Sequence, residues 1–245
     1  MKAYSRMNIF LKYLLISTFM FFITMITVNF IWYPYPLNKI LELNHILLIM
    51  FLVNIILGPI LILVIYKKDR KKLLIDLIII FSLQMMGLIY GVYTIAKVRP
   101  VWIVFSVDRF ELVRANEVIE NKNIEIKPEY KEKNWLGPKY VAIQLSKNKQ
   151  QRLSDIFNAI NGMTVAKQPH RYINIENIKK DIQHAALPIK CLENYNPKNK
   201  IKEIISTYPK ADSWLPLESS INDGVVLINK DSLTIISIVN LKPWK

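Results

Sequence analysis

Three long apolar runs at the start of the chain constrain its fold more than any other feature. Residues 13–31 carry no charge, residues 46–66 are uncharged with one amide, Asn54, and residues 73–96 include one carboxylate, Asp76. Each run has the roughly 20 residues that a helix needs to cross a hydrocarbon core of ~30 Å. Backbone amides have no water partner in lipid, so each run is expected to be helical. The sequence therefore predicts three transmembrane helices at these positions.

The first run is expected to be an uncleaved anchor and not a signal peptide. It follows a basic start of Lys2, Arg6 and Lys12, as a signal peptide would. However, it is longer than the apolar region of a signal peptide and ends in the bulky sequence IWYP at 31–34. No cleavage site of the small-x-small type follows it.

Basic residues near the ends of the apolar runs predict how the chain crosses the membrane. Three precede the first run, five lie in the KKDRKK connection at 67–72, and one, Lys39, lies in the first connection. Because cytoplasmic loops carry the excess of Lys and Arg, the N-terminus and the second connection are expected in the cytoplasm. Three crossings then place the rest of the chain on the far side. The predicted domains are a membrane anchor over 1–96 and a periplasmic domain over 97–245.

A few polar and small residues within the apolar runs predict how the helices pack. Gln84 lies near mid-bilayer, where an interhelical hydrogen bond is expected, with Asn54 as a candidate partner. Gly58 precedes a proline and should loosen or kink the second helix. Gly87 and Gly91 form a small-x-x-x-small pattern, which lets helix backbones approach closely. Together these residues predict a packed bundle with a surface that could receive another helix.

Asp76 lies about one turn inside the cytoplasmic end of the third run, and two roles stay open for it. It could pair with Lys72, four residues earlier, or extend toward the interface. It could instead face the bundle and meet a polar partner.

The net charge of +14 would suit a nucleic-acid partner, but its distribution argues against one. Nine basic and three acidic residues precede Lys97, and 24 basic and 16 acidic residues follow from there. The later basic residues are scattered among acids and form no stripe interleaved with aromatic side chains, as nucleic-acid modules show. We expect no nucleic-acid binding and a solvated basic surface that can face anionic lipid headgroups.

The remaining residues alternate strand-like and helix-like patterns. The run VWIVFSV at 101–107 is β-branched and aromatic, as in a buried strand, and apolar residues recur at helical spacing over 153–160. Strands at both ends with helices between them predict an α+β domain with a mainly antiparallel sheet. The expected strands are 101–107, 140–145, 224–229 and 233–239, and the expected helices are 153–160, 175–186 and 201–207.

No recognisable catalytic, cofactor or metal motif occurs in the sequence. The chain has no P-loop, no G-x-S-x-G and no H-E-x-x-H. His170, His184 and Cys191 could be combined into a metal or Cys–His site, but isolated histidines beside a buried thiol fit better. Cys191 is the one cysteine of the chain, so no internal disulfide can form. We therefore expect no cofactor, no metal and no catalytic activity.

A membrane enzyme acting on lipid or glycan stays open as a minor alternative. Such an enzyme needs paired carboxylates or a nucleophile near the outer interface. Glu42, Asp108, Arg109 and Glu111 are the residues that could supply them. Asp108 and Arg109, which directly follow a predicted strand, fit a local ion pair better than a catalytic one.

Several of these segments occur together in one known family. The chain resembles the type IV pilin accessory proteins of the TfpX/TfpZ type, and the matching motifs span nearly its whole length in order. Only the middle, roughly 115–210, carries no matching motif. The motifs are WYPYPL at 32–37, ILGPILILVIY at 56–66, KKDRKK at 67–72, LIDL at 74–77 with Gln84, YG at 90–91, RPVWIVFSVDRF at 99–110, WLPL at 214–217 and LKPW at 241–244.

The resemblance implies an inner-membrane protein of Gram-negative bacteria with a periplasmic domain. Such a protein would assist the stability or assembly of a cognate pilin and would not be an enzyme. The alternative of a different class is a membrane-tethered periplasmic binding protein, of the immunity or sensor type, which needs the same anchor and no active site.

If the chain binds a pilin, two groups of residues are the candidates for contact with it. In the bilayer, polar and small residues of the bundle could hold the hydrophobic helix of the pilin. At the outer surface, the aromatic and proline-rich first connection and the start of the domain could contact the pilin head. The first group is Asn54, Gly58, Gln84, Gly87 and Gly91, and the second is Trp32, Tyr33, Pro34, Pro36, Arg99, Asp108 and Arg109.

Overall fold

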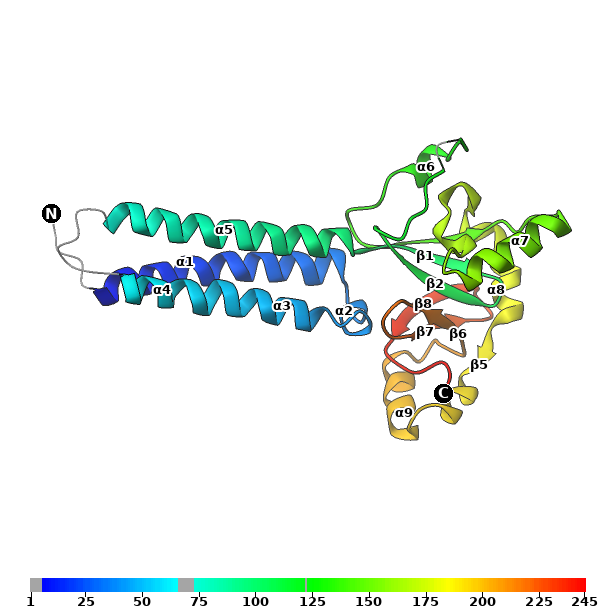
Figure 1. Cartoon of the computed structure of the whole chain (residues 1–245). Helices are drawn as coiled ribbons and strands as arrows, with labels where there is room; N and C mark the ends of the chain where they lie inside the picture. Colours follow the sequence, from blue (N-terminus) through cyan, green and yellow to red (C-terminus); the bar gives the residue numbers. More distant parts are fainter. Residues whose placement is uncertain (1–5, 66–72, 122) are drawn as a thin grey trace. The chain divides into compact units, whose positions relative to one another are not determined.

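The computed structural model describes residues 6–65, 73–121 and 123–245 and divides into two compact units. The first, here called the helical unit, runs up to Ile31 and includes Glu42–Lys97. The second, here called the sheet unit, joins Trp32–Leu41 to Val98–Lys245 (Figure 1). The first connection between apolar helices is thus part of the same compact unit as the C-terminal domain.

The helical unit contains three helices that are long and apolar enough to cross a membrane, as predicted. Figure 1 shows them side by side. The basic connection at 67–72 lies outside the described residues. The first helix is α1 (Arg6–Thr27) with the π-helical η1 (Val28–Trp32), the second is α3 (Leu43–Phe51) with the π-helical η2 (Leu52–Leu57) and α4 (Gly58–Ile65), and the third is α5 (Leu73–Lys97).

Large apolar side chains cover the outside of the helical unit. Leu15 and Phe19 on α1 and Leu83 and Ile89 on α5 are all more than half exposed. An apolar surface of this extent is unusual on a soluble monomer and ordinary on a helix in contact with lipid.

The sheet unit is built on one mixed sheet in the order β4-β3-β1-β2-β6-β7-β8, with β5 paired to β6. The β1–β3 and β2–β6 pairs are parallel, and the other described pairs are antiparallel. The strands are β1 (Pro100–Ser106), β2 (Arg109–Arg114), β3 (Lys139–Ile143), β4 (Tyr172–Ile173), β5 (Leu187–Pro188), β6 (Ser213–Glu218), β7 (Gly224–Asn229) and β8 (Thr234–Val239).

The predicted strands are all present, but two central strands were not predicted. In β2, the sequence RFELVR, charged side chains interrupt the apolar residues, and β6 contains Pro216. The charges of β2 lower the apolar content expected of a central strand, and proline is typical of an edge strand, yet the two strands pair with each other in the middle of the sheet. Their parallel pairing, and that of β1 with β3, gives the sheet a mixed character that the sequence did not predict.

Helices and short turns between the strands complete the sheet unit. Its core includes an apolar cluster around Trp102, Tyr130 and Tyr172 and another around Leu192 and Trp214. The α-helices are α2 (Leu37–Ile40), α6 (Pro128–Lys131), α7 (Lys149–Ile160), α8 (Lys179–Ala185) and α9 (Lys198–Thr207), and the 3₁₀ turns are η3 (Val165–Lys167), η4 (Pro169–Arg171), η5 (Ile175–Ile178) and η6 (Ile189–Asn194).

The first connection packs firmly into the sheet unit. Tyr33, Leu37 and Ile40 are buried, and the side-chain amide of Asn222 donates to the Ile40 carbonyl at 3.3 Å. A Cβ at Gly224 would lie 2.7 Å from the Ile40 Cδ1 and 3.3 Å from the Val239 carbonyl oxygen, so glycine lets the connection approach without displacing these atoms. A segment that links two apolar helices is therefore anchored by the far end of the chain.

Candidate functional site

The candidate residues from the sequence lie in three separate places. Asn54, Gly58, Gln84, Gly87 and Gly91 lie in the helical unit. In the sheet unit, the residues of the first connection meet Arg99, whereas the Asp108–Arg109 pair lies at the turn between β1 and β2.

A buried polar centre joins all three apolar helices. The Tyr13 hydroxyl on α1 donates to the Gln84 side-chain oxygen on α5. Gln84 Nε2 in turn donates to the backbone carbonyl of Asn54 in η2 at 2.8 Å. Asn54 and Gln84 are only 4% and 7% exposed. The predicted bond between Gln84 and Asn54 is present, although it uses the Asn54 main chain.

The local sequence explains why the Asn54 carbonyl needs a partner from another helix. In the i→i+5 pattern of a π-helical segment, its donor would be residue 59, which is a proline without an N–H. The Asn54 side chain meanwhile donates to the Met50 carbonyl at 2.9 Å. The irregularity predicted at Gly58–Pro59 is therefore present and creates the acceptor that Gln84 fills.

The three glycines pack against other side chains of the helical unit. The Gln84 side chain occupies the place where a Cβ at Gly58 would lie. A Cβ at Gly91 would lie 2.8 Å from Met50 Cε, whereas one at Gly87 would be in ordinary contact with Val53 at 3.8 Å. The small and polar residues of the bundle are thus used to hold its own helices together.

Asp76 lies in the first turn of α5 and is half-buried. Its predicted partner Lys72 lies outside the described residues. Both roles considered for Asp76 therefore stay open.

Arg99 links the start of the domain to the first connection and to the loop before β3, and its contacts are here called the Arg99 clamp. Its guanidinium carbon lies 3.8 Å from the centroid of the Trp135 ring, which also contacts the Trp32 ring with centroids 5.9 Å apart. Arg99 donates to the carbonyls of Asn134 and Lys133, each at 3.3 Å. Burial lowers the pKa of Arg99, and the phenol of Tyr33 opposes this change. These contacts indicate a positioning role for Arg99.

Tyr33 and the two prolines of the first connection directly follow Trp32, which contacts the Arg99 clamp through Trp135. Burial raises the pKa of Tyr33, against the opposing charges of Arg114 and Arg99. Pro34 and Pro36 border a hollow of about 260 Å³ that Ile238 of β8 also lines. The connection is thus shaped by packing within the sheet unit.

Asp108 and Arg109 form the predicted ion pair. Arg109 Nε lies 2.9 Å from Asp108 Oδ1, and Arg109 Nη1 lies 3.3 Å from a carboxylate oxygen of Glu218. The hydrogen bond from Arg109 to Asp108 raises the pKa of Arg109, although burial opposes this effect. The guanidinium also lies over the Trp244 ring, 5.5 Å from its centroid. The pair therefore links the β1–β2 turn to β6 and to the C-terminal segment.

Glu111, a residue of the enzyme alternative, has a perturbed carboxyl group. Burial raises the pKa of Glu111 most, and the neighbouring carboxylate of Glu218 adds to the rise. The nearby hydroxyl groups of Thr164 and Ser106 lower this pKa. Glu111 and Glu218 are register partners in the parallel β2–β6 pair.

The histidines and the cysteine do not form a metal site. Within residues 6–65, 73–121 and 123–245, no three His, Cys, Asp or Glu side chains are placed to hold a metal ion together. Cys191 packs beside the apolar cluster of Trp214, and His184 lines a different hollow next to Phe105. Burial lowers the pKa of His170, which supports a neutral side chain.

Helix α7 is a candidate site that the sequence did not identify. Asp155, on its polar side, pairs with Arg171 at 3.3 Å, and the two side chains are only 13% and 12% exposed. Arg171 also donates to the Gln144 carbonyl at the end of β3, at 3.1 Å. Helix α7 is therefore attached to the sheet unit through its charged side.

The apolar stripe of α7 consequently faces solvent. All of α7 is described, and none of its side chains is buried. Amphipathic helices of globular proteins normally bury such a stripe, so this orientation is the reverse of the usual one. Residues 153–163 carry the stripe, with exposed fractions of 50% for Leu153, 59% for Ile156, 67% for Phe157, 76% for Ile160 and 45% for Met163.

Basic side chains lie at the N-terminal end of the stripe. Lys149 and Arg152 occupy the first turn of α7, and the Asn148 side chain caps it by accepting from the Gln150 N–H at 2.9 Å. The sequence predicted the helix and its stripe. It carried no signal for the outward orientation, because helical periodicity is the same for a stripe that faces in or out.

Comparison with known proteins finds curated relatives that are fimbrial assembly proteins of Dichelobacter nodosus. The serogroup I protein is 28% identical and the serogroup E1 protein 26% identical, each over 162 residues. Each match covers 65% of this chain and 63% of the relative, so the chain spans under two thirds of their length. The protein of serogroups C1 and C2 is 29% identical over 92 residues, which are 37% of this chain and 70% of that protein.

No family model and no solved structure matches the chain. The relatives nevertheless confirm the resemblance to pilus accessory proteins that the sequence motifs predicted, at the level of fimbrial assembly proteins.

Proposed function

We propose that this chain, a homologue of fimbrial assembly proteins, binds a cognate type IV pilin at the inner membrane and stabilises it before or during pilus assembly. The names of the relatives support the process. The single observation that carries the binding role is the exposed apolar stripe of α7, which a partner can cover. The role requires no turnover, and we propose no catalytic activity.

The proposed topology has three spans, a cytoplasmic N-terminus and a periplasmic sheet unit. Its main support is that Trp32–Leu41 and Val98–Lys245 form one compact unit. Two segments that pack together this way must lie on the same side of a membrane. This requires the helices between them to cross it an even number of times, which α3–α4 and α5 do. The basic residues counted in the sequence then assign that side to the periplasm.

We propose that the apolar outer surface of the bundle, and not its polar and small residues, contacts the pilin helix. Gln84, Asn54 and the glycines satisfy one another, and the outward surfaces of α1 and α5 stay apolar. A pilin helix would pack on such a surface through van der Waals contacts, which compete with lipid and give weak association. Weak association suits a factor that must release its partner to the pilus assembly apparatus.

The sheet unit would contact the pilin head through α7. Its stripe is large and apolar, and the ammonium and guanidinium groups of Lys149 and Arg152 flank one end. The matching surface on the partner is therefore apolar, with carboxylates at one edge. Such an interface has an apolar centre and a charged rim, the usual arrangement for reversible complexes.

A complementation experiment tests the function. A strain lacking the gene would receive the unaltered chain, the stripe variant Phe157→Ser/Ile160→Ser, or the control Leu136→Ser/Ile205→Ser, which changes exposed apolar residues elsewhere. We expect surface pili to be restored by the unaltered chain and the control, and not by the stripe variant present at equal level. Normal piliation in the deletion strain would refute the proposal.

A further inference from the structure

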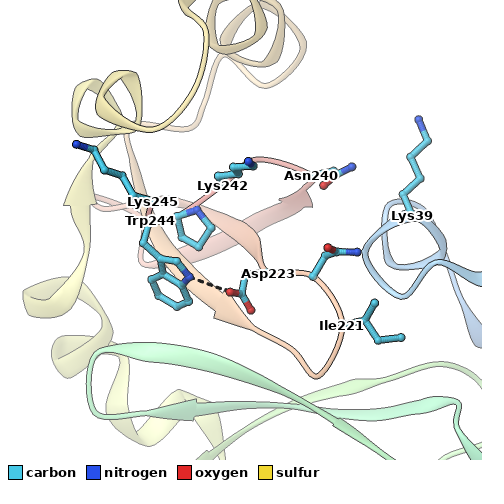
Figure 2. A pocket seen from close by; sticks show the side chains of 9 residues that line it. Lys39, Ile221, Asp223, Asn240, Lys242, Trp244 and Lys245 are labelled. Carbon is cyan, nitrogen blue, oxygen red and sulfur yellow. Dashed lines mark hydrogen bonds between the residues drawn. The ribbon is translucent and has the colours of Figure 1, made fainter.

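A hollow lined by lysines lies in the sheet unit where three distant segments meet. It has a volume of about 490 Å³. Lys39 comes from the first connection, Asn222 and Asp223 from the turn between β6 and β7, and Lys242 and Lys245 from the segment after β8. Figure 2 shows Lys39 and Lys245 on opposite sides of the hollow, Lys242 between them, and the bond between Trp244 and Asp223.

The walls of the hollow are held by hydrogen bonds that do not involve the lysine side chains. The Trp244 indole N–H donates to Asp223 Oδ2 at 2.8 Å, and the Ser219 N–H donates to Asp223 Oδ1 at 2.9 Å. The main chain of Lys242 is fixed by Asn196, which accepts from its N–H at 2.9 Å and donates to its carbonyl at 2.8 Å. The backbone of the hollow is therefore formed before any ligand arrives.

The charge of the hollow is positive. Among the nine described residues that line it, three are lysines and one, Asp223, is a carboxylate. Both Asp223 oxygens already accept hydrogen bonds within the wall. In the described part of the chain, none of the three lysines forms an ion pair. An ammonium group carries three donors and the oxygens of a phosphate group are acceptors, so a hollow lined by lysines suits a phosphate.

Chain connectivity places one of these lysines at the membrane surface, if the proposed topology holds. Lys39 lies seven residues after Trp32, where the first apolar span ends, and four residues before Leu43, where the second begins. Its ammonium lies over the exposed Tyr35 ring, 5.3 Å from the centroid. Tyrosine and lysine together are typical of the headgroup region. A phosphate at this level of the chain belongs most naturally to a phospholipid.

We infer that this hollow is a binding site for a phosphate group, presented by the headgroup of an anionic phospholipid in the outer leaflet. Lys39, Lys242 and Lys245 neutralise the phosphate, and the Asn222 amide lies at the same rim. Binding there would hold the sheet unit to the lipid surface in addition to its covalent links to the three apolar helices.

Native mass spectrometry of the full chain in detergent tests the site. Phosphatidylglycerol and phosphatidylcholine are the two probes, and the variant is Lys39→Gln/Lys242→Gln/Lys245→Gln. The control, Lys190→Gln/Lys202→Gln/Lys210→Gln, removes three exposed lysines outside the hollow. We expect at least tenfold tighter binding of phosphatidylglycerol, lost in the variant and kept in the control. Each lysine near an anionic headgroup contributes about fivefold.

A second arm separates the lipid from a soluble phosphate. Inorganic phosphate is titrated into the same proteins by calorimetry. Binding that requires the three lysines, without a preference for phosphatidylglycerol, would support the phosphate site and assign it to a soluble ligand. If the lysine variant keeps both its lipid preference and its phosphate binding, or if the unaltered chain has neither, the inference is overturned. Lys242→Glu provides the same comparison should the triple variant misfold.

The inference rests on the proposed membrane topology, but its failure can be told apart from failure of the proposed function. If the chain restores piliation but its lipid binding does not depend on the three lysines, the phosphate site alone is refuted. If lipid binding depends on the three lysines but the deletion strain has normal pili, the pilus role alone is refuted.

Discussion

Gln84 on the third apolar helix donates a hydrogen bond of 2.8 Å to the main-chain carbonyl of Asn54 on the second. The same side chain accepts from the Tyr13 hydroxyl on the first helix. One amide therefore joins three helices, at a place where a proline has removed the local donor. In lipid such an unsatisfied carbonyl is costly, so this bond explains how an irregular second helix is tolerated.

Replacing Gln84 by leucine should weaken the bundle. Both the Asn54 carbonyl and the Tyr13 hydroxyl would lose their partner, at a cost of about 1–3 kcal/mol. Thermal unfolding of the full chain in detergent would measure it, with Ser82→Ala on the exposed side of α5 as the control. Tyr13→Phe in the Gln84→Leu background should cost less than it does alone, and strict additivity would contradict the shared bond.

Two glycines of the bundle should respond in opposite ways to alanine. At Gly58 the new methyl group would occupy the space of the Gln84 side chain, so overpacking of about 1–3 kcal/mol is expected. At Gly87 it would lie 3.8 Å from Val53, and the higher helix propensity of alanine should leave stability unchanged or raised by up to about 1 kcal/mol. The same unfolding assay compares them, and equal effects would refute this packing.

The attachment of α7 should depend on the Asp155–Arg171 pair. Asp155→Asn removes a half-buried ion pair that holds the helix through its polar side, at a cost of about 1–3 kcal/mol. We expect faster hydrogen–deuterium exchange over residues 149–160 and little change elsewhere. Glu176→Gln breaks an exposed pair with Lys179 and is the matched control. Unchanged exchange in α7 would show that other contacts hold it.

The half-buried Glu111 should make stability depend on pH. Burial raises the pKa of Glu111 in the folded chain above its ordinary value of 4.5, so the folded state binds its proton more tightly than the unfolded state. The resulting stability is complete below pH 4.5 and is lost as the pH rises through the folded pKa. Glu111→Gln should therefore stabilise the chain relative to the unaltered one at neutral pH, with the advantage vanishing toward pH 4. A difference in unfolding temperature that does not change with pH would contradict this.

Those parts of the fold that depend on local composition could be predicted from the sequence. The three apolar helices follow from run length, and β1, β3, β7 and β8 follow from β-branched runs bounded by turn residues. The central strands β2 and β6 could not be predicted, because Glu111 and Pro216 contradict the usual pattern of a buried strand. What places them in the sheet is pairing with partners far along the chain.

The candidate site could be predicted only in part, because some of its contacts also join residues that are far apart in the sequence. The bond from Gln84 to Asn54 follows from the rule that buried amides in lipid find partners. The packing of the first connection against the C-terminal domain could not be predicted. It depends on contacts such as the hydrogen bond from Asn222 to Ile40, which are 182 residues apart in the sequence. The outward stripe of α7 depends on Arg171, whose role only the folded chain defines.

Photocrosslinking in living cells tests the central claim, that a pilin covers the exposed stripe of α7. The photoreactive amino acid p-benzoylphenylalanine would replace Phe157 or Ile160, and Lys180, exposed on α8, would be the control position. The account predicts a light-dependent product with the cognate pilin from positions 157 and 160 and not from 180. Normal levels of the chain and of the pilin with no product from either stripe position, or with equal products from all three, would contradict it.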